Sequence, residues 1–261
     1  MRKIALVSTL LAFSATASAG TMSVRVERPD WYKLLNQISA WNVVLSGEID
    51  AGAPARVAQA LKQVGNDGAD VYLDSPGGSL VAGMQMGRLL RKAGANTHIG
   101  SLAVDNEHKF AGKPGVKPVP GGCFSACSLA FLGGEYRYAM DGSQFGVHRF
   151  SSPSGPTEGD LDAAQVISAS IGNYIRDMEV DQGLFGLMAS QGKEGIRILT
   201  KSELTGFNVV NNGRKRPEWS IEAIEGGQYL RGVQDTVYGQ GKAVFLCEQR
   251  RIWMQSFYQI C

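Results

Sequence analysis

The sequence lacks a clear excess of charge of either sign, since 26 lysines and arginines stand against 24 aspartates and glutamates among its 261 residues. No nucleic-acid partner is therefore expected, because binding to a phosphate backbone needs a basic surface. The one basic cluster, Arg214-Lys215-Arg216, precedes a proline and is typical of a solvated linker. Beyond the first nineteen residues the chain also lacks a long apolar run, so no membrane-spanning helix is expected.

Histidine and cysteine are scarce, with three of the former and four of the latter. They are not spaced in the two pairs that a zinc site needs, and we expect no metal and no other cofactor. Four cysteines allow three disulfide connectivities. We favour Cys247–Cys261, which would tie down the C-terminus, while Cys123 and Cys127 could pair with each other or be buried free thiols.

The first nineteen residues have the layout of a secretory signal peptide. Arg2 and Lys3 give a positive start, residues 4–17 are mostly apolar and small, and Ala17-Ser18-Ala19 matches a cleavage site. This apolar stretch is too short to span a bilayer; the alternative is a cytosolic N-terminal helix. We therefore expect residues 1–19 to be removed and the mature chain to begin at Gly20 in an oxidising compartment.

Strands and helices are predicted to alternate over the first part of the mature chain. The expected strands are 43–49, 71–74 and 97–102, and the expected helices are 55–64 and 80–93. Such alternation predicts an α/β core with a parallel sheet. Residues 103–122 are rich in glycine and proline, and we interpret them as a long loop that is functional or mobile.

The second half of the chain continues the core and then changes character. An apolar helix is expected up to Leu132, followed by strands at 136–140 and 145–150, a long helix from about Gly159, a capped helix at 200–206 and a strand at 207–210. Asn211-Asn212-Gly213 marks a boundary. Four short strands at 219–224, 229–233, 243–247 and 252–258 predict a small β-rich annex at 213–261, after a core domain at 20–212.

Ser125 stands where a glycine-rich segment turns into a helix. Its hydroxyl would lie at the positive end of the helix dipole, near backbone N–H groups that could hold an oxyanion. An acyl-transfer nucleophile needs that environment, although serine is also a good helix N-cap. His148, in the predicted strand 145–150, could come within hydrogen-bond reach of Ser125 and act as its base. A lone histidine is, however, more often structural.

A third segment, Ser75-Pro76-Gly77-Gly78, forms a turn at the carboxyl end of a predicted parallel strand. The proline presets the turn, and the glycines permit a positive φ and a close approach of the backbone to a ligand. In open α/β sheets, ligands bind at that edge. Taken alone, the segment fits a tight turn as well as it fits a binding site.

In this order, the segments Leu73-Asp74-Ser75-Pro76-Gly77-Gly78-Ser79, Ser125-Ala126-Cys127 and Gly146-Val147-His148 resemble the ClpP/crotonase superfamily. The resemblance is to the Clp proteolytic subunit and the signal-peptide-peptidase-like branch. With residues 199–210, which are similar to the closing helix and strand of the family, it covers roughly residues 40–210. The Cys-x-Ser-Ala-Cys segment is similar to that of exported ClpP-like proteins of Gram-negative bacteria, which implies a periplasmic location.

The resemblance implies a ββα spiral core and a serine peptidase or hydrolase. Ser125 would be the nucleophile and His148 the general base. The backbone N–H groups of Gly78 and Ala126 would form the oxyanion hole, and a peptide would lie extended beside Gly77 and Gly78.

The third member of the triad departs from the family pattern. The family has an aspartate before the closing helix, whereas residues 190–195 contain none. Glu194 is the nearest carboxylate that could orient His148, with a solvated loop charge as the alternative. Asp177 and Asp181 are expected on the surface. Without an orienting acid, a catalytic histidine can take the wrong tautomer.

Three functions follow as hypotheses. The first is a serine peptidase of the cell envelope that acts on peptides or flexible segments; an exported protein has no ATP supply, so no ATP-driven unfoldase partner is expected. The second is a catalytically weak or inactive binding or assembly module with the same fold. The third is acyl-CoA chemistry of the crotonase type, which would not need the Ser125–His148 pair. The family fold also implies a homo-oligomer.

Overall fold

The computed structural model describes residues 20–28, 41–110, 113–149, 160–192, 195–224, 227–248 and 251–260. The expected signal peptide lies outside these residues and stays a prediction. Among the described residues, no helix is both long and apolar enough to cross a membrane.

The core is organised around a five-stranded sheet in the order β1-β2-β3-β4-β8. Its strands are β1 (Ser23–Glu27), β2 (Trp41–Ser46), β3 (Ala69–Asp74), β4 (Asn96–Ile99) and β8 (Arg137–Ala139). β1 is antiparallel to β2, and the other neighbours are parallel. Val43, Val44 and Leu45 are all buried, which is the continuous apolar run expected where both faces of a parallel sheet are covered.

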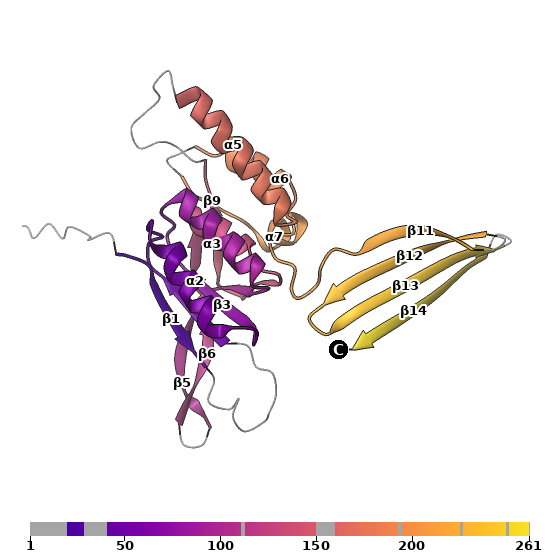
Figure 1. The fold of residues 1–261 in the computed structure, drawn as a ribbon, viewed down its shortest axis with the longest axis horizontal. Helices are drawn as coiled ribbons and strands as arrows, with labels where there is room; N and C mark the ends of the chain where they lie inside the picture. The colour runs from indigo at the N-terminus through magenta and orange to yellow at the C-terminus, as the bar shows by residue number, and fades with distance from the viewer. Residues whose placement is uncertain are drawn as a thin grey trace, which may run out of the picture.

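Two helices connect the parallel strands, as the sequence predicted: α2 (Ala53–Val64) between β2 and β3, and α3 (Leu80–Lys92) between β3 and β4 (Figure 1). Ala53, Val57, Ala60 and Val64 give α2 its buried stripe. α3 begins at Ser79, whose hydroxyl accepts a hydrogen bond from Ala82 N–H. The turn that precedes this N-cap is therefore held in place by the start of α3.

A second sheet has the order β10-β9-β7, with β7 (Gly122–Phe124) parallel to β9 (Gln144–Val147) and β9 antiparallel to β10 (Arg197–Ile198). The helices that complete the core are α4 (Ala126–Leu132), α5 (Asp160–Asp177), α6 (Gly183–Ser190) and α7 (Lys201–Gly206). This arrangement is an α/β core with a mainly parallel sheet, so the predicted α/β fold class is confirmed. The ββα spiral of the ClpP/crotonase superfamily stays what the resemblance implies. The strands β1, β7 and β10 and the helix α6 were not predicted from the sequence.

Helix α4 is buried along its whole length and packs against α3. The two backbones come close because α3 presents glycine: a Cβ at Gly83 would lie 2.4 Å from Ala126 O. Tyr174 of α5 donates a hydrogen bond to Leu129 O at 2.5 Å, beside Gly87 of α3, where a Cβ would lie 2.9 Å from the same carbonyl oxygen. The helix that follows Ser125 is thus held by both α3 and α5.

The prediction of a loop at 103–122 is wrong. The strands β5 (Ser101–Phe110) and β6 (Lys113–Val119) form an antiparallel hairpin with a register shift between Asp105 and Lys109. Its prolines are tolerated because a two-stranded ribbon has only edge strands, where a missing N–H need not break a ladder. The predicted strand 97–102 is likewise two strands, divided at Gly100, where φ is +139° and a Cβ would lie 2.2 Å from Val119 O.

In the closing segment, residues 199–210, the predicted helix is present and the predicted strand is not. Thr200 Oγ1 accepts from Glu203 N–H, and the Glu203 carboxylate accepts from Thr200 N–H, so the expected capping box is present. Residues 207–210 form a turn instead of a strand. The carbonyls of Asn208 and Val209 accept hydrogen bonds from the side chain of Arg137, where a strand would have used them in a ladder.

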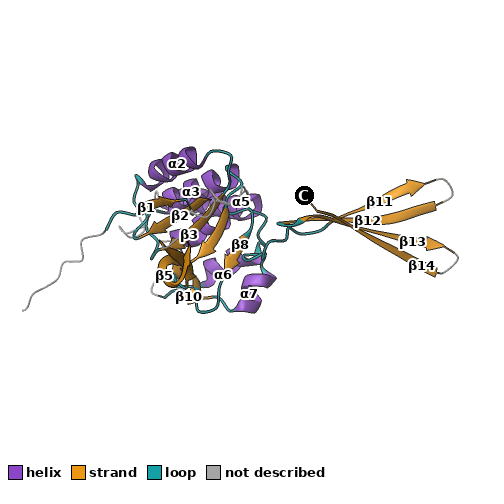
Figure 2. Cartoon of the chain, turned by 90° about the horizontal axis from the view of Figure 1, so that it is seen from below, coloured by secondary structure: helices purple, strands orange, loops and turns teal. Residues whose placement is uncertain are grey.

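The predicted β-rich C-terminal part is a four-stranded antiparallel sheet in chain order. Its strands are β11 (Glu218–Ile224), β12 (Gly227–Thr236), β13 (Gly239–Glu248) and β14 (Arg251–Ile260). The sheet extends away from the α/β core as a single layer (Figures 1 and 2). The division into two domains at residue 212 stays a prediction.

Candidate active site

Ser125 occupies a sharp turn between β7 and α4. Its backbone has φ 57° and ψ −121°, a region that favours glycine and costs a serine about 1–3 kcal/mol. Ser125 N–H donates to Gly146 O at 3.0 Å, and Ser125 C=O accepts from Ser128 N–H at 3.0 Å. Its side chain makes no capping hydrogen bond to α4. A strained turn of this kind between a strand and a helix exposes a nucleophilic hydroxyl.

A disulfide between Cys123 and Cys127 spans this turn, with Cα atoms 5.2 Å apart. Of the two alternatives left open for these cysteines, pairing with each other is therefore confirmed. Both are fully buried, and Ser125 is the middle residue of the loop that they close. The bridge ties β7 to the first turn of α4. The favoured Cys247–Cys261 pair involves Cys261, which lies outside the described residues.

His148 meets Ser125 directly. Its Nε2 lies 2.7 Å from Ser125 Oγ, and its Nδ1 lies 2.9 Å from the carbonyl oxygen of Arg149. A carbonyl oxygen can only accept, so Nδ1 carries the proton and Nε2 is left as the acceptor for the serine hydroxyl. The sequence predicted that these two side chains meet; the structure adds a backbone carbonyl that sets the tautomer.

Gly77 and Gly78 pass immediately beside the turn. A Cβ at Gly77 would lie 2.7 Å from both Phe124 O and Ser125 Cβ, and 3.1 Å from Ala126 N. Ile49 N–H donates to Gly77 O at 2.7 Å, and Ile49 O accepts from Ser79 N–H at 2.8 Å. In this parallel bridge the N–H of Gly78 points away from Ile49.

Gly78 and Ala126 are the two backbone donors predicted for an oxyanion. Gly78 is exposed, and its N–H donates to no group within the part of the chain that the structure describes. Ala126 is the first residue of α4, where an N–H has no carbonyl partner within its own helix. Because Gly77 brings its backbone against Ala126, the arrangement suits an anion held between the turn and the helix start.

Replacing Gly77 with alanine should lower the free energy of unfolding by about 1–3 kcal/mol or more, because φ is +106° and the new Cβ would meet Phe124 O. Urea denaturation followed by circular dichroism measures the change. Gly186→Ala, inside α6 with nothing within 4 Å of the added Cβ, is the matched control and should be neutral or slightly stabilising. Equal stability of the two variants would contradict the tight approach.

An apolar ledge, formed by Phe124, Ile196 and Ile198, surrounds Gly146, two residues before His148. Phe124 and Ile198 are the cross-strand partners of Gly146, and a Cβ there would lie 2.5 Å from Ile196 Cγ2 and 2.6 Å from Phe124 Cδ1. Gly146 is the penultimate residue of β9, and His148 directly follows the strand. Ile196 and Ile198 are 48% and 42% exposed, so the ledge is open to a ligand. Sequence reasoning missed these three residues. The usable signal was Gly146, two residues before His148, because a glycine in a strand leaves room for neighbouring side chains.

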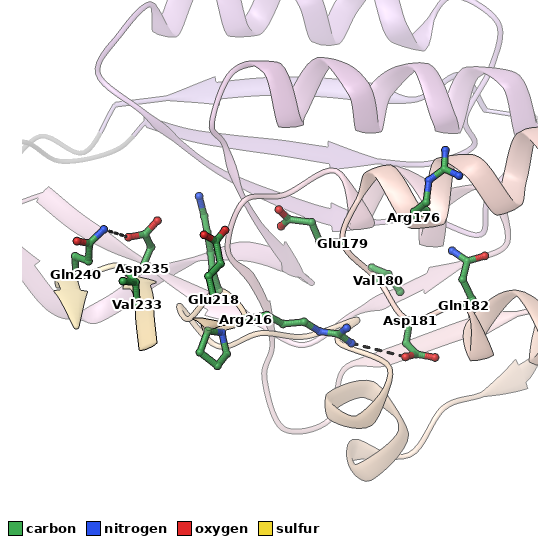
Figure 3. Close-up of a pocket in the computed structure, with 12 residues that line it drawn as sticks. Arg176, Glu179, Val180, Asp181, Gln182, Arg216, Glu218, Val233, Asp235 and Gln240 are labelled. Atoms are coloured by element: carbon green, nitrogen blue, oxygen red, sulfur yellow. Dashed lines mark hydrogen bonds and ion pairs between the residues drawn. The ribbon is translucent and has the colours of Figure 1, made fainter. Parts of the chain in front are cut away.

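The remaining carboxylates lie elsewhere. Glu194 is outside the described residues, so its orienting role stays a prediction. Asp177 and Asp181 have half-exposed side chains as expected, and they contact Arg176 and Arg216. Asp181 and Arg216 line a cavity of about 520 Å³ between the end of α5 and the base of the C-terminal sheet (Figure 3). Neither Ser125 nor His148 borders that cavity, which mixes acidic and basic side chains.

One cluster of possible metal ligands occurs among the described residues. Asp105, Glu107 and His108 bring one ligand atom each within 4.8 Å of one another at the irregular part of the β5–β6 hairpin. The Asp105 carboxylate already accepts from His108 Nδ1 at 2.8 Å and from the N–H groups of Glu107 and His108. These contacts lower its pKa, with the His108 side chain as the main cause. The turn that Asp105 closes accounts for the cluster.

Comparison with known proteins gives likeness in structure and none in sequence. No protein-family model and no curated protein matches the chain. Among solved structures, ClpP1 from Listeria monocytogenes is similar at 16% identity with a TM-score of 0.47, and a point mutant of the same protein at 17% with a TM-score of 0.45. Each match covers 65% of this chain and 88% of the other. These likenesses assign no role to any residue of this chain.

Proposed function

We propose that this chain is a serine hydrolase that cleaves peptides through an acyl-enzyme on Ser125. The observation that carries the proposal is the 2.7 Å contact between Ser125 Oγ and His148 Nε2 at a strained turn. A nucleophile with a base in hydrogen-bond reach, and the base held in one tautomer by a further acceptor, is the arrangement that activated serines require.

The reaction follows from these positions. Ser125 Oγ attacks the scissile carbonyl carbon while its proton passes to His148 Nε2. The oxyanion is held by the N–H groups of Gly78 and Ala126, each worth about 3 kcal/mol of barrier in comparable sites. Collapse of the tetrahedral adduct expels the amine, which takes the proton from His148. Water then hydrolyses the ester by the same route and releases the acid.

The surroundings suggest the kind of substrate. The apolar ledge offers a place for an apolar side chain next to the scissile bond, and the exposed backbone at Gly78 can pair with an extended peptide. The proposal includes export to the periplasm. Substrates there would be peptides or flexible segments, because no ATP would be available to drive unfolding.

The test is labelling of the purified mature protein with a fluorophosphonate, which reacts with activated serines. Wild-type protein should label at Ser125, Ser125→Ala should not, and the matched control Ser190→Ala, an exposed serine at the end of α6, should label like the wild type. Labelling that persists in Ser125→Ala, or folded wild-type protein that never labels, would refute the proposal.

A second candidate is a binding or assembly module that keeps this fold. The single-layer C-terminal sheet, with large apolar side chains in contact with solvent, favours it. The same labelling experiment separates the two candidates. An assembly module would not react with the fluorophosphonate, whether or not a reductant has opened the Cys123–Cys127 disulfide.

A further inference from the structure

The C-terminal sheet has one face without charge. The pairing of β11 to β14 runs without a bulge, so cross-strand partners share a face and neighbours along a strand alternate. Ile221, Leu230, Phe245 and Met254 form one row across all four strands. None of the described side chains on this face, the uncharged face, is acidic or basic. The charged side chains Glu218, Glu222, Arg231, Asp235 and Lys242 all lie on the opposite face.

The uncharged face is open to solvent. Ile221 is 72% exposed, Met254 66% and Trp219 52%. The indole of Trp219 lies over Gly232, where a Cβ would be 2.5 Å away, and its ring centre is 5.9 Å from that of Phe245. Trp219 therefore lies down on the sheet and does not project from it. The opposite face combines its charges with the exposed aromatic side chains Trp253 and Phe257. A sheet normally buries the face that lacks charge against another layer, and no described element supplies that layer here.

We infer that the uncharged face docks against the same face of a second copy of this chain. In a two-fold dimer the face meets itself, so any charge on it would oppose a like charge or remain buried without a partner. Its lack of charge removes that obstacle. The opposite face keeps its ion pairs, such as Arg231–Glu222 at 3.2 Å, in water. Two such sheets would stack about 10 Å apart as a β-sandwich.

The size of the face suits this partner. Four strands at about 4.8 Å spacing are about 19 Å wide, and strands of seven to ten residues at about 3.4 Å per residue are about 24–34 Å long. The face therefore offers roughly 500–600 Å², near the lower end of what each partner contributes to a stable interface. A lipid surface is less suited, because the charged side mixes acids and bases and lacks the basic excess that anionic lipids attract.

Sedimentation velocity of the full mature chain tests the inference. Wild-type protein should associate with rising concentration, and Ile221→Glu should lose one association step, giving half the mass at the same concentration. The matched control is Phe257→Glu, which changes a 51% exposed aromatic residue on the opposite face and should sediment like the wild type. Ser125→Ala should also associate normally, since docking does not depend on the proposed hydrolase site.

Met254→Gln, a milder change in the same row, should weaken the association and covers the case in which Ile221→Glu does not fold. Circular dichroism checks folding of each variant. The inference fails if wild-type protein stays monomeric throughout, or if both row variants fold and associate unchanged. It also fails if monomeric protein sediments with phosphatidylglycerol vesicles and Ile221→Glu does not, because the face would then bind lipid.

Discussion

Replacing His148 with alanine is expected to slow acylation of Ser125 by about 10²- to 10⁴-fold, the range over which a positioned general base contributes to catalysis. The reason is the 2.7 Å contact through which Nε2 would take the proton of the serine hydroxyl. The rate constant for fluorophosphonate labelling measures the same activation, because Ser125 Oγ attacks phosphorus and expels fluoride while its proton passes to His148. It isolates the first chemical step and needs no knowledge of the natural substrate.

A matched control makes this prediction specific. His108→Ala removes a histidine whose side chain is 85% exposed on the β5–β6 hairpin, and it should label at the wild-type rate. A His148→Ala protein that folds and labels as fast as the wild type would show that the histidine is structural.

How far the sequence predicted this site depends on which contacts are local. Ser125 was placed by the junction between a glycine-rich segment and an apolar helix, and His148 by its position in the next strands; the structure brings both together. The contact between Nδ1 and Arg149 O was not predictable, because it depends on how the chain leaves β9 and not on any periodicity. The ledge residues Ile196 and Ile198 were missed because β10 is only two residues long.

The loop predicted at residues 103–122 was wrong for a reason of composition. Residues 103–122 looked like a loop because seven of the twenty are glycine or proline, yet a two-stranded ribbon tolerates both at its open edges. In the C-terminal sheet, turn residues placed the four strands correctly. The uncharged face emerged only from the register, since a shift by one residue would exchange the two faces.

Residues 207–210 were predicted as a strand because Val209 and Val210 are apolar, and both are indeed buried. The carbonyls of Asn208 and Val209 accept hydrogen bonds from a side chain about seventy residues earlier in the chain. No local sequence pattern reveals such a distant donor. That side chain, Arg137, is fully buried and donates to five backbone carbonyls. Its partners are Val209 and Gly134 at 2.9 Å, Asn208 at 2.8 Å, and Leu132 and Met178 at 3.4 Å.

Arg137→Met is therefore expected to lower the free energy of unfolding by about 3–5 kcal/mol, because it leaves a group of buried carbonyls without donors. Urea denaturation measures the loss. The control is Arg176→Met on α5, where a 68% exposed arginine makes a 3.5 Å contact with Asp177 and removal should change stability by about 0.5 kcal/mol or less. Similar losses in the two variants would contradict the central role of Arg137.

Arg137→Lys separates charge from geometry. Burial lowers the pKa of the Arg137 guanidinium to about 10, so the side chain is still charged at neutral pH. A lysine would keep the charge but offers three donors from one atom, which cannot reach carbonyls arranged around a planar fork. We expect Arg137→Lys to lower the free energy of unfolding by most of the amount that Arg137→Met does. Because Leu132 ends α4, the helix that begins directly after Ser125, both variants should also weaken the support of the turn that holds the nucleophile.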